Sequence, residues 1–219
     1  MSRIFRGIIM GAPGSGKGTI AARIIKHFNV KHVSSGDLLR AYMQEASNWG
    51  TKARAYVESG QLVPDDMMVE MMEKALLSVG HGSWLLDGFP RTRWQAEVLL
   101  SKHNVNGVIN LVVPYEVILD RVKGRWIHEP SGRVYNMDFN APKVPGLDDV
   151  TGEALVQRVD DRPETVRRRL EIYSSMTKPI LELCDQAGIL NNFYGSKTDG
   201  IWPNVLNYLK EQMVPSVEL

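Results

Sequence analysis

A glycine-rich segment near the start of the chain carries residue types that bind phosphate. Gly11–Thr19 reads Gly-Ala-Pro-Gly-Ser-Gly-Lys-Gly-Thr, with an apolar, β-branched run (Ile4–Met10) before it and helical periodicity (Lys17–Phe28) overlapping its end. Glycines let backbone N–H groups turn toward an anion, a helix amino end adds a positive dipole, and Lys17 can reach the β- and γ-phosphates of a nucleotide. The segment therefore predicts a phosphate-binding loop for a nucleoside triphosphate.

The loop departs from the common pattern at one position. Gly18 stands where most such loops place the Ser or Thr that binds Mg²⁺, and Thr19 follows one residue later. Asp87 ends an apolar run, where a carboxylate can orient water around Mg²⁺, although an N-cap for the next helix is the alternative. We expect no direct protein site for Mg²⁺, which phosphates and water would hold, with Thr19 and Asp87 nearby.

Arginines gather in the second half of the chain although the formal net charge is only +1. Such a cluster suggests a small polyanion as ligand, whereas a solvated helix face is the ordinary alternative. We adopt the alternative for Arg162, Arg167 and Arg168, and for Arg121 an ion pair with Glu116 or Asp120 stays open. The remaining candidates are Arg125, Arg158 and Arg169.

Short apolar runs alternate with helical stretches, which predicts a parallel sheet of about five strands with helical crossovers and a ligand site at the carboxyl ends of the strands. Strands are expected at Ile4–Met10, Lys31–Val33, Trp84–Leu86, Val108–Val113 and Ile189–Phe193. Helices are expected at Lys17–Phe28, Asp37–Glu45, Thr51–Ser59, Asp65–Val79, Arg93–Lys102, Tyr115–Gly124, Pro163–Ala187 and Trp202–Met213, with Ser35 as an N-cap. The fold class is therefore α/β.

Two segments interrupt this rhythm. Residues 34–63 place two helices between successive strands, and residues 126–161 contain prolines, glycines and short β-like runs without a helical period. A segment of the second kind is too long for a plain loop in a compact domain and is typical of a lid. We expect one core with two insertions.

Composition excludes several classes of protein. The 219 residues are 43% hydrophobic and 23% charged, and no apolar run is long enough to cross a bilayer. Cys184 is the single cysteine, so an internal disulfide and a multi-cysteine zinc site are excluded. We expect a protein of a reducing compartment with no nucleic acid or membrane partner.

Several motifs together resemble the adenylate kinase family. They are the loop Gly11–Thr19 and the segments Ser34-Ser-Gly-Asp-Leu-Leu-Arg40, Gly60-Gln-Leu-Val-Pro-Asp65, Trp84-Leu-Leu-Asp-Gly-Phe-Pro-Arg-Thr92, Gly132-Arg-Val-Tyr-Asn136 and Asp160-Asp161…Arg169. Within the family, Arg125-Trp-Ile-His and Ile201-Trp-Pro are most similar to the long-lid, zinc-free GTP:AMP phosphotransferases of the mitochondrial matrix. The resemblance runs from about Arg6 to Leu209.

The resemblance implies a P-loop NTPase-type sheet with a helical AMP-binding insertion and a β-rich lid. The implied boundaries are a core of 1–33, 64–123 and 162–219, an AMP-binding insertion of 34–63 and a lid of 124–161. The implied activity is reversible transfer of the terminal phosphoryl group of GTP, or of ATP or ITP, to AMP with Mg²⁺, by a monomer. A general ATP:AMP adenylate kinase, a P-loop signalling switch and an inactive nucleotide-binding scaffold remain alternatives.

The same resemblance assigns site residues. Donor-nucleotide residues would be Gly14, Ser15, Gly16, Lys17, Gly18, Thr19, Arg121, Arg125, Tyr135, Asn136 and Thr198. AMP would meet Ser35, Arg40, Gln61, Leu62, Val63, Gly88, Phe89, Pro90, Arg91, Gln95, Arg158 and Arg169, with Gln95 reading adenine. Catalysis would rest on Lys17, Asp87, Arg91, Arg125, Arg158 and Arg169. Because Arg93-Trp94 precede Gln95 where relatives often have an apolar residue and proline, the helix start could shift.

Two further segments occupy positions or carry sequences that are similar to functional elements of other proteins. His128, Ser131, Asp148 and Thr151 stand where some relatives have zinc-binding cysteines, and they resemble the hydrogen-bonded substitute of zinc-free members, so we expect no structural zinc. Ser196-Lys-Thr-Asp199 is similar to the guanine-reading element of switch GTPases, but its first residue differs and we interpret it as coincidence. Met1–Arg6 is basic like a transit peptide, yet the first strand follows at once, so we expect no cleaved presequence. The resemblance implies a location in the mitochondrial matrix, and the cytoplasm is the alternative.

Overall fold

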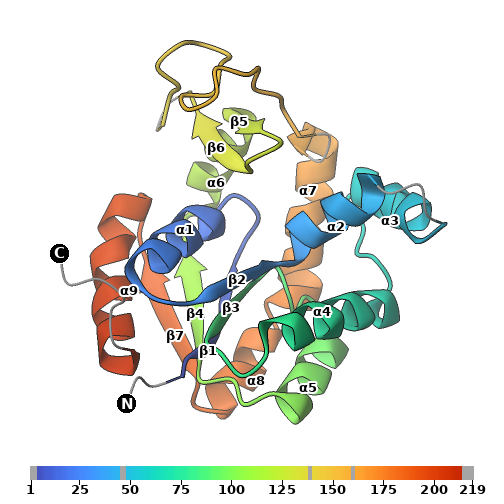
Figure 1. Ribbon diagram of the computed structural model, residues 1–219, viewed down its shortest axis with the longest axis vertical. Coiled ribbons are helices and arrows are strands. Elements are labelled where there is room, and N and C mark those ends of the chain that lie inside the picture. Colours follow the sequence, from blue (N-terminus) through green and yellow to red (C-terminus); the bar gives the residue numbers. More distant parts are fainter. Residues whose placement is uncertain (1–3, 45–47, 138–139, 159–160, 214–219) are drawn as a thin grey trace.

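A five-stranded parallel sheet forms the centre of the protein (Figure 1). The computed structural model describes residues 4–44, 48–137, 140–158 and 161–213. The strands are β1 (Arg6–Gly11), β2 (Lys31–Ser34), β3 (Trp84–Asp87), β4 (Gly107–Val112) and β7 (Leu190–Tyr194), in the order β2-β3-β1-β4-β7. All four pairings are parallel, which confirms the predicted α/β fold.

Helices cover both faces of this sheet. On one face, α1 (Lys17–His27) and α9 (Thr198–Gln212) pack on Ile9, Leu85 and Ile109. On the other, α4 (Asp65–Val79), α5 (Arg93–Lys102) and α8 (Ile180–Gln186) pack on Ile8, Leu86 and Val108. Because successive side chains of a strand point to opposite faces, each run feeds both cores, which explains why the strands read as unbroken apolar segments.

The strand register brings three functional segments to one edge of the sheet. Asp87 at the end of β3 is the register partner of Ile9 in β1 and of Ser34 in β2. Gly11, which ends β1, pairs with Leu111 of β4. The carboxyl ends of these strands therefore lie at the same edge of the sheet, where a ligand site is expected in an open α/β sheet.

The two insertions stand above that edge in Figure 1. One contains α2 (Ser35–Gln44) and α3 (Asn48–Glu58). The other follows α6 (Tyr115–Lys123) and contains an antiparallel hairpin of β5 (Arg125–His128) and β6 (Arg133–Asn136), which the bridge Ile127↔Val156 joins to the following chain.

Most predicted bounds agree with the structure to within three residues, but three predictions are wrong. Ser35 is not an N-cap: it is the first residue of α2, and Ser34 Oγ accepts a hydrogen bond from Asp37 N at 3.2 Å. The helix α9 begins at Thr198, four residues before the predicted Trp202. Glu45, predicted as the end of a helix, lies outside the described residues.

The predicted long helix Pro163–Ala187 is also interrupted. It consists of α7 (Pro163–Ile172), the π-helix η2 (Tyr173–Thr177) and α8. Lys178 N donates to Tyr173 O at 2.8 Å, a wider turn than that of an α-helix. Pro179 follows directly and has no N–H, and its ring clashes with the carbonyl four residues earlier in a regular α-helix, so the wider turn relieves this conflict.

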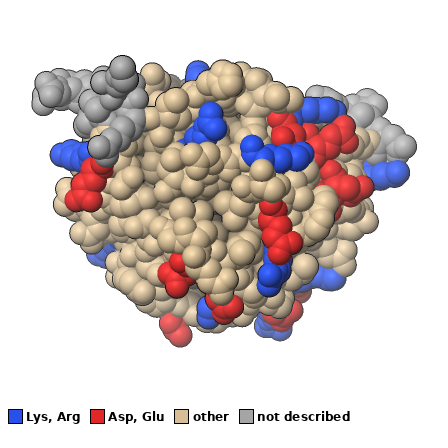
Figure 2. Space-filling model, turned by 90° about the horizontal axis from the view of Figure 1, so that it is seen from below, with Lys and Arg blue, Asp and Glu red and all other residues tan. Residues whose placement is uncertain are grey.

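The end of the molecule opposite the insertions has a mixed charge. Seen from below in Figure 2, acidic and basic side chains are interspersed around a largely uncharged middle. This face therefore offers no single-sign field for an anion. Within the described ranges, no helix combines the length and the apolar character that a bilayer span requires.

Candidate functional site

A cleft of about 1090 Å³ lies at the carboxyl edge of the sheet, between the core and both insertions. It exceeds the range of about 300–1,000 Å³ that is common for a single small-molecule site. Every predicted donor, acceptor and catalytic residue lines it except Ser15 and Ser35. The structure therefore brings the two predicted nucleotide sites together in one cleft.

The glycine-rich loop joins β1 to α1, as its sequence predicts. Gly14 and Gly16 adopt φ values of +82° and +95°, in the left-handed region that favours glycine. A Cβ at Gly16 would lie 2.6 Å from Thr198 Cγ2, so this glycine also lets the loop approach the start of α9. Nothing lies within 4 Å of a Cβ built at Gly18, so the position of the usual magnesium-binding hydroxyl is open.

Lys17 lies folded over this loop at the first position of α1. Its Nζ donates to Gly11 O at 2.8 Å and to Ala12 O at 2.9 Å. Burial lowers the pKa of Lys17 to about 8, Asp87 opposes this shift, and the charges of Arg91, Arg169 and Arg125 add to it. The positive charges of the arginines therefore act on the lysine. An anionic ligand between these groups would raise the pKa of Lys17 again.

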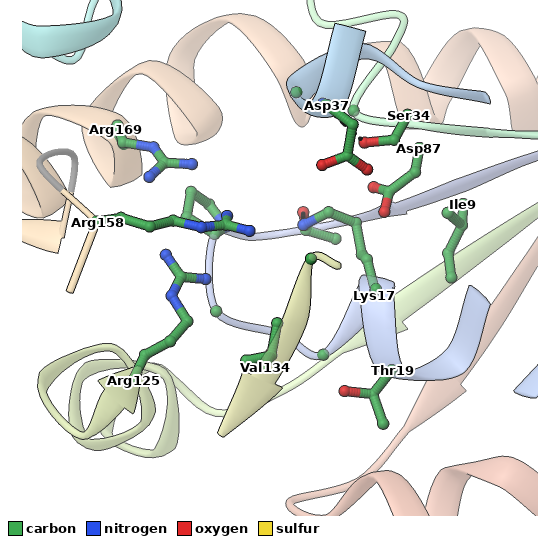
Figure 3. Close-up of a pocket in the computed structure, with 18 of the residues that line it drawn as sticks. Ile9, Lys17, Thr19, Ser34, Asp37, Asp87, Arg125, Val134, Arg158 and Arg169 are labelled. Carbon is green, nitrogen blue, oxygen red and sulfur yellow. Dashed lines mark hydrogen bonds between the residues drawn. The ribbon is translucent and has the colours of Figure 1, made fainter. Parts of the chain in front are cut away.

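Three arginine side chains from different parts of the chain converge beside Lys17. Figure 3 shows the guanidinium groups of Arg125, Arg158 and Arg169 gathered on one side of the cleft, with Lys17 between them and Asp87. Arg125 makes a two-point ion pair with Asp161, which includes an Nε–Oδ2 hydrogen bond of 2.7 Å. A paired guanidinium is fixed in orientation, so this arginine is aimed at the cleft before any ligand binds. Asp160 of the predicted motif lies outside the described residues.

The part of the cleft that the predicted AMP residues line is called the acceptor half. It contains two arginines that pair with neighbouring groups. Arg91 Nε donates to Gly88 O at 2.7 Å, and Arg40 pairs with Asp37 one helical turn before it. Gly88 has a φ of +79°, and a Cβ there would lie 2.6 Å from Ser35 Oγ. This close approach requires glycine and seats Ser35 directly beneath the loop that carries Arg91.

Ser15 and Ser35 are the predicted residues that do not line the cleft. Both are fully buried, and their hydroxyl oxygens have no hydrogen-bond partner among the described residues. An unpaired buried hydroxyl costs about 1–3 kcal/mol. A predicted nucleotide contact at these two residues therefore requires a small local opening, or contact through the backbone.

Gln95 lies at the base of the acceptor half, 2% exposed. Its Oε1 accepts from Arg91 N at 2.7 Å and its Nε2 donates to Asp65 Oδ1 at 2.7 Å. The helix α5 begins at Arg93 as predicted, with Thr92 as its N-cap, so Trp94 does not displace Gln95. Thr92, not Asp87, caps this helix, which removes the alternative role of Asp87.

The part of the cleft that the predicted donor-nucleotide residues line is called the donor half. It is bounded by α6, the loop before α9 and the β5–β6 hairpin. Arg121 donates to Ser15 O at 3.0 Å and to Ser196 O at 2.9 Å, so it joins the phosphate-binding loop to the loop before α9. Asn136 Nδ2 donates to Arg121 O at 2.8 Å. Tyr135 lines the cleft, but its hydroxyl donates to Asp148 Oδ1 at 2.9 Å within the insertion and therefore does not point freely at a ligand.

Asp87 and Thr19 differ in their suitability for a bound Mg²⁺. The Asp87 carboxylate is largely buried and raises the pKa of Lys17, so it faces the phosphate-binding loop. Thr19 is exposed, and Figure 3 shows its side chain on the other side of Lys17 from Asp87. The structure thus fits a water-mediated role for Asp87 and sets Thr19 apart from it. His32, which the sequence analysis missed, lies beside Asp87 with Nε2 3.7 Å from Oδ2.

A polar network braces the second insertion where relatives can bind zinc. His128 Nδ1 lies 2.7 Å from Ser131 Oγ, and Thr151 Oγ1 donates to Asp148 Oδ2 at 3.0 Å. Arg133 forms a two-point ion pair with Asp148 at 2.7 and 2.8 Å, and this hydrogen bonding holds the pKa of Asp148 far below its usual range. The four predicted residues therefore form one hydrogen-bonded network, and no cluster of three or more potential metal ligands occurs in the described part of the chain.

Sequence reasoning missed the residues that hold the predicted ones. Asp37, Asp65 and Asp161 pair with Arg40, Gln95 and Arg125, and Thr177 Oγ1 donates to Arg91 O at 3.0 Å from the π-helix. Asp37, Asp65 and Asp161 lie inside motifs that were recognised, but only their positions in space identify their partners.

Comparisons with known proteins agree with this geometry. Residues 9–189 match the family model "Adenylate kinase". The chain is 47% identical to a mitochondrial GTP:AMP phosphotransferase of Drosophila melanogaster, over 97% of this chain and 98% of the relative. It is 42% identical to a mitochondrial GTP:AMP phosphotransferase of Saccharomyces cerevisiae, over 92% and 91%. It is 43% identical to an adenylate kinase of Staphylococcus aureus, over 87% and 91%.

The lowered pKa of Lys17 predicts proton uptake when a triphosphate binds. At pH 8.5 much of the lysine is uncharged in the free protein, because its pKa is about 8. Phosphate charge raises this pKa, so binding should take up about three quarters of a proton at pH 8.5 and almost none at pH 6.5. Calorimetry in buffers of different ionisation enthalpy measures the uptake. Lys17→Met should abolish it, and equal uptake by this variant would contradict the assignment.

The polar network predicts that the second insertion is stable without zinc. Treatment with a chelator should leave Tm unchanged, and elemental analysis should find no stoichiometric zinc. Asp148→Asn should lower Tm because Arg133 and Thr151 lose a charged acceptor. Asp149→Asn, an exposed neighbour, is the matched control and should lower Tm less. A fall in Tm on chelation, or equal effects of the two variants, would contradict this interpretation.

Proposed function

The chain belongs to the adenylate kinase family, and we propose that this nucleoside monophosphate kinase transfers the terminal phosphoryl group of GTP, or of ATP or ITP, reversibly to AMP. The observation that carries the proposal is the position of Lys17 on a phosphate-binding loop, facing Arg91, Arg125, Arg158 and Arg169 in one cleft. Neither a switch GTPase nor an inactive nucleotide-binding scaffold requires arginines for the phosphate of a second nucleotide in addition to the phosphate-binding loop.

The chemistry needs alignment and charge neutralisation more than covalent assistance. The transition state of phosphoryl transfer is loose, and its charge is spread over the equatorial oxygens of the moving group. Lys17 meets this charge from the loop side and the arginines from the opposite side. One well-placed arginine contributes a rate factor of about 10³–10⁵ in this type of reaction. No residue is required as a general base in this proposal.

Orientation of these cations is the second contribution of the chain. Asp161 holds Arg125, and the carbonyl of Gly88 holds Arg91. Fixed donors cost little reorganisation when charge develops on the phosphoryl oxygens. We assign Lys17, Arg91, Arg125, Arg158 and Arg169 to transition-state stabilisation on this basis.

Mg²⁺ would accompany the donor nucleotide, where it neutralises and orients the phosphates. In this chain Asp87 would orient water around the ion from the end of β3, and the open position of Gly18 leaves room for a hydrated ion. Thr19 is exposed on the other side of Lys17 from Asp87, so we assign it no direct role in holding the ion.

The two insertions would have different roles in substrate binding. We assign residues 34–63 to AMP, since α2 and the segment Gln61–Val63 line the acceptor half. We assign residues 124–161 to a lid, because its hairpin lines the donor half and a closed lid would exclude water that otherwise hydrolyses the triphosphate. The core would be 1–33, 64–123 and 162–219.

A preference for GTP over ATP as the phosphoryl donor is the more specific part of the proposal. Two relatives that match more than nine tenths of this chain are named GTP:AMP phosphotransferases. Arg121 can stack on either purine, so the backbone around Thr198, which lies against the phosphate-binding loop, would make the choice. The names of the same relatives support a mitochondrial location, and within the mitochondrion we propose the matrix. The protein would act as a monomer.

Loss of Lys17 should separate catalysis from folding. Lys17→Met should lower kcat by about 10²–10³ or more, because a charge on the transferred group loses a preorganised partner. Thermal unfolding should remain cooperative. The assay follows formation of ADP from AMP together with loss of triphosphate. Triphosphate loss without AMP consumption, or wild-type kcat in the variant, would contradict the proposal.

Donor selectivity should favour guanine. Adenine and guanine differ in the donors and acceptors of their Watson–Crick edge, and each buried polar group left unpaired costs about 1–3 kcal/mol. We expect kcat/KM at saturating AMP to be about tenfold higher for GTP than for ATP, with ITP showing how much the 2-amino group contributes. If ATP equals or exceeds GTP, the protein is a general adenylate kinase and the acceptor half of the proposal remains.

A further inference from the structure

Asp65 lies at the first position of α4 and binds two residues at the start of α5. Its Oδ1 accepts from Gln95 Nε2 at 2.7 Å, and its Oδ2 accepts from Thr92 Oγ1 at 2.9 Å. Thr92 and Gln95 are 6% and 2% exposed, so both bonds reach into the interior. Asp65 itself does not line the cleft, whereas Gln95 does.

These bonds leave the amide of Gln95 only one orientation. Its Oε1 faces Arg91 N at 2.7 Å, a group that can only donate, and its Nε2 faces a carboxylate, which can only accept. A flipped amide would place N–H against N–H and oxygen against oxygen. Two unfavourable contacts in a buried place exclude the flip.

The helix start reinforces this arrangement. The Thr92 hydroxyl donates to Asp65, so its oxygen is free to accept the backbone N–H of Gln95 at 3.3 Å. The same aspartate thereby orients the cap of α5 and the side chain three residues after it. A carboxamide oxygen can accept two hydrogen bonds and its nitrogen can donate two, so each atom of Gln95 retains capacity for one more.

The remaining acceptor and donor of Gln95 match one class of purine. The Watson–Crick edge of a 6-aminopurine presents an amino donor beside a ring nitrogen acceptor, which pairs with an amide oxygen beside an amide N–H. A 6-oxopurine presents the reverse order and would need the flipped amide. We propose that Asp65 is a positioning residue that makes the acceptor site select 6-amino over 6-oxo purine monophosphates, by locking the amide of Gln95.

This inference rests on the proposed function, in which Gln95 faces the acceptor base. A simpler role for Asp65 is a favourable acidic charge in the first turn of α4. Asp66 shares that turn, is exposed and so provides a matched control. A helix-terminus role predicts similar effects of the two residues on stability and no effect on base selectivity.

Binding of AMP and IMP tests the proposal, since IMP carries a 6-oxo group without the 2-amino group of GMP. Calorimetry measures both Kd values with a non-hydrolysable GTP analogue in the donor site. Wild type should prefer AMP, and Asp65→Asn should reduce this preference about tenfold, because an asparagine amide can also pair with the reversed Gln95 amide and only Arg91 N then opposes the reversal. Asp66→Asn should leave the preference unchanged, and Asp65→Glu should retain most of it.

Several outcomes would overturn the proposal. They are an unchanged AMP-to-IMP preference in Asp65→Asn, the same loss in Asp66→Asn, or no preference in wild type. Gln95→Ala covers the case in which Asp65→Asn does not fold: it should abolish the preference, and its retention would refute a role for the amide. Phosphoryl transfer is assayed separately, so failure of wild type to phosphorylate AMP would refute the proposed function while these binding ratios still decide the role of Asp65.

Discussion

Repulsion among like charges at the end of one sheet is the constraint on which the structure depends. Lys17 and the arginines share a cleft, and their mutual influence helps to lower the pKa of Lys17. Such a cluster forms only if acids and carbonyls offset the repulsion before an anion arrives. Asp87 does this for Lys17 and Asp161 for Arg125. The cleft is therefore preorganised for an anion that completes its charge balance.

The core and the insertions hold their residues by different kinds of contact. The parallel sheet and its two apolar cores fix the phosphate-binding loop and Asp87, since both follow buried strands in register. The insertions contribute groups held by polar contacts, such as Asp148 with Arg133. A fully satisfied polar network rigidifies the segment that contains it, which suits the lid role proposed for residues 124–161.

Several predicted site residues are held in place by residues of other elements. Thr177 reaches Arg91 from a π-helix, a feature that is frequent at functional sites, and Asp65 reaches Gln95 from another helix. Thr177, which itself lines the cleft, holds the backbone of Arg91, whereas Asp65, which does not line the cleft, holds the side chain of Gln95. Under the proposal for Asp65, the specificity of the acceptor site depends on a residue that does not line the cleft.

Local patterns in the sequence determined the sheet, the phosphate-binding loop and most helix bounds, because strand alternation, glycine turns and helical periodicity depend on near neighbours. The loop of Gly11–Thr19 and the exact bounds of α4 are examples. The π-helix before Pro179 and the cap at Ser34 were not predicted, because helical periodicity does not distinguish an α-turn from a π-turn, or Ser34 from its neighbour Ser35 as the cap. Only the tertiary structure decided that Asp161 holds Arg125 and that Asp65 holds Gln95. These partners lie 36 and 30 residues apart, and a pairing of that range is set by the meeting of helices and strands in space, which leaves no periodic trace in the sequence.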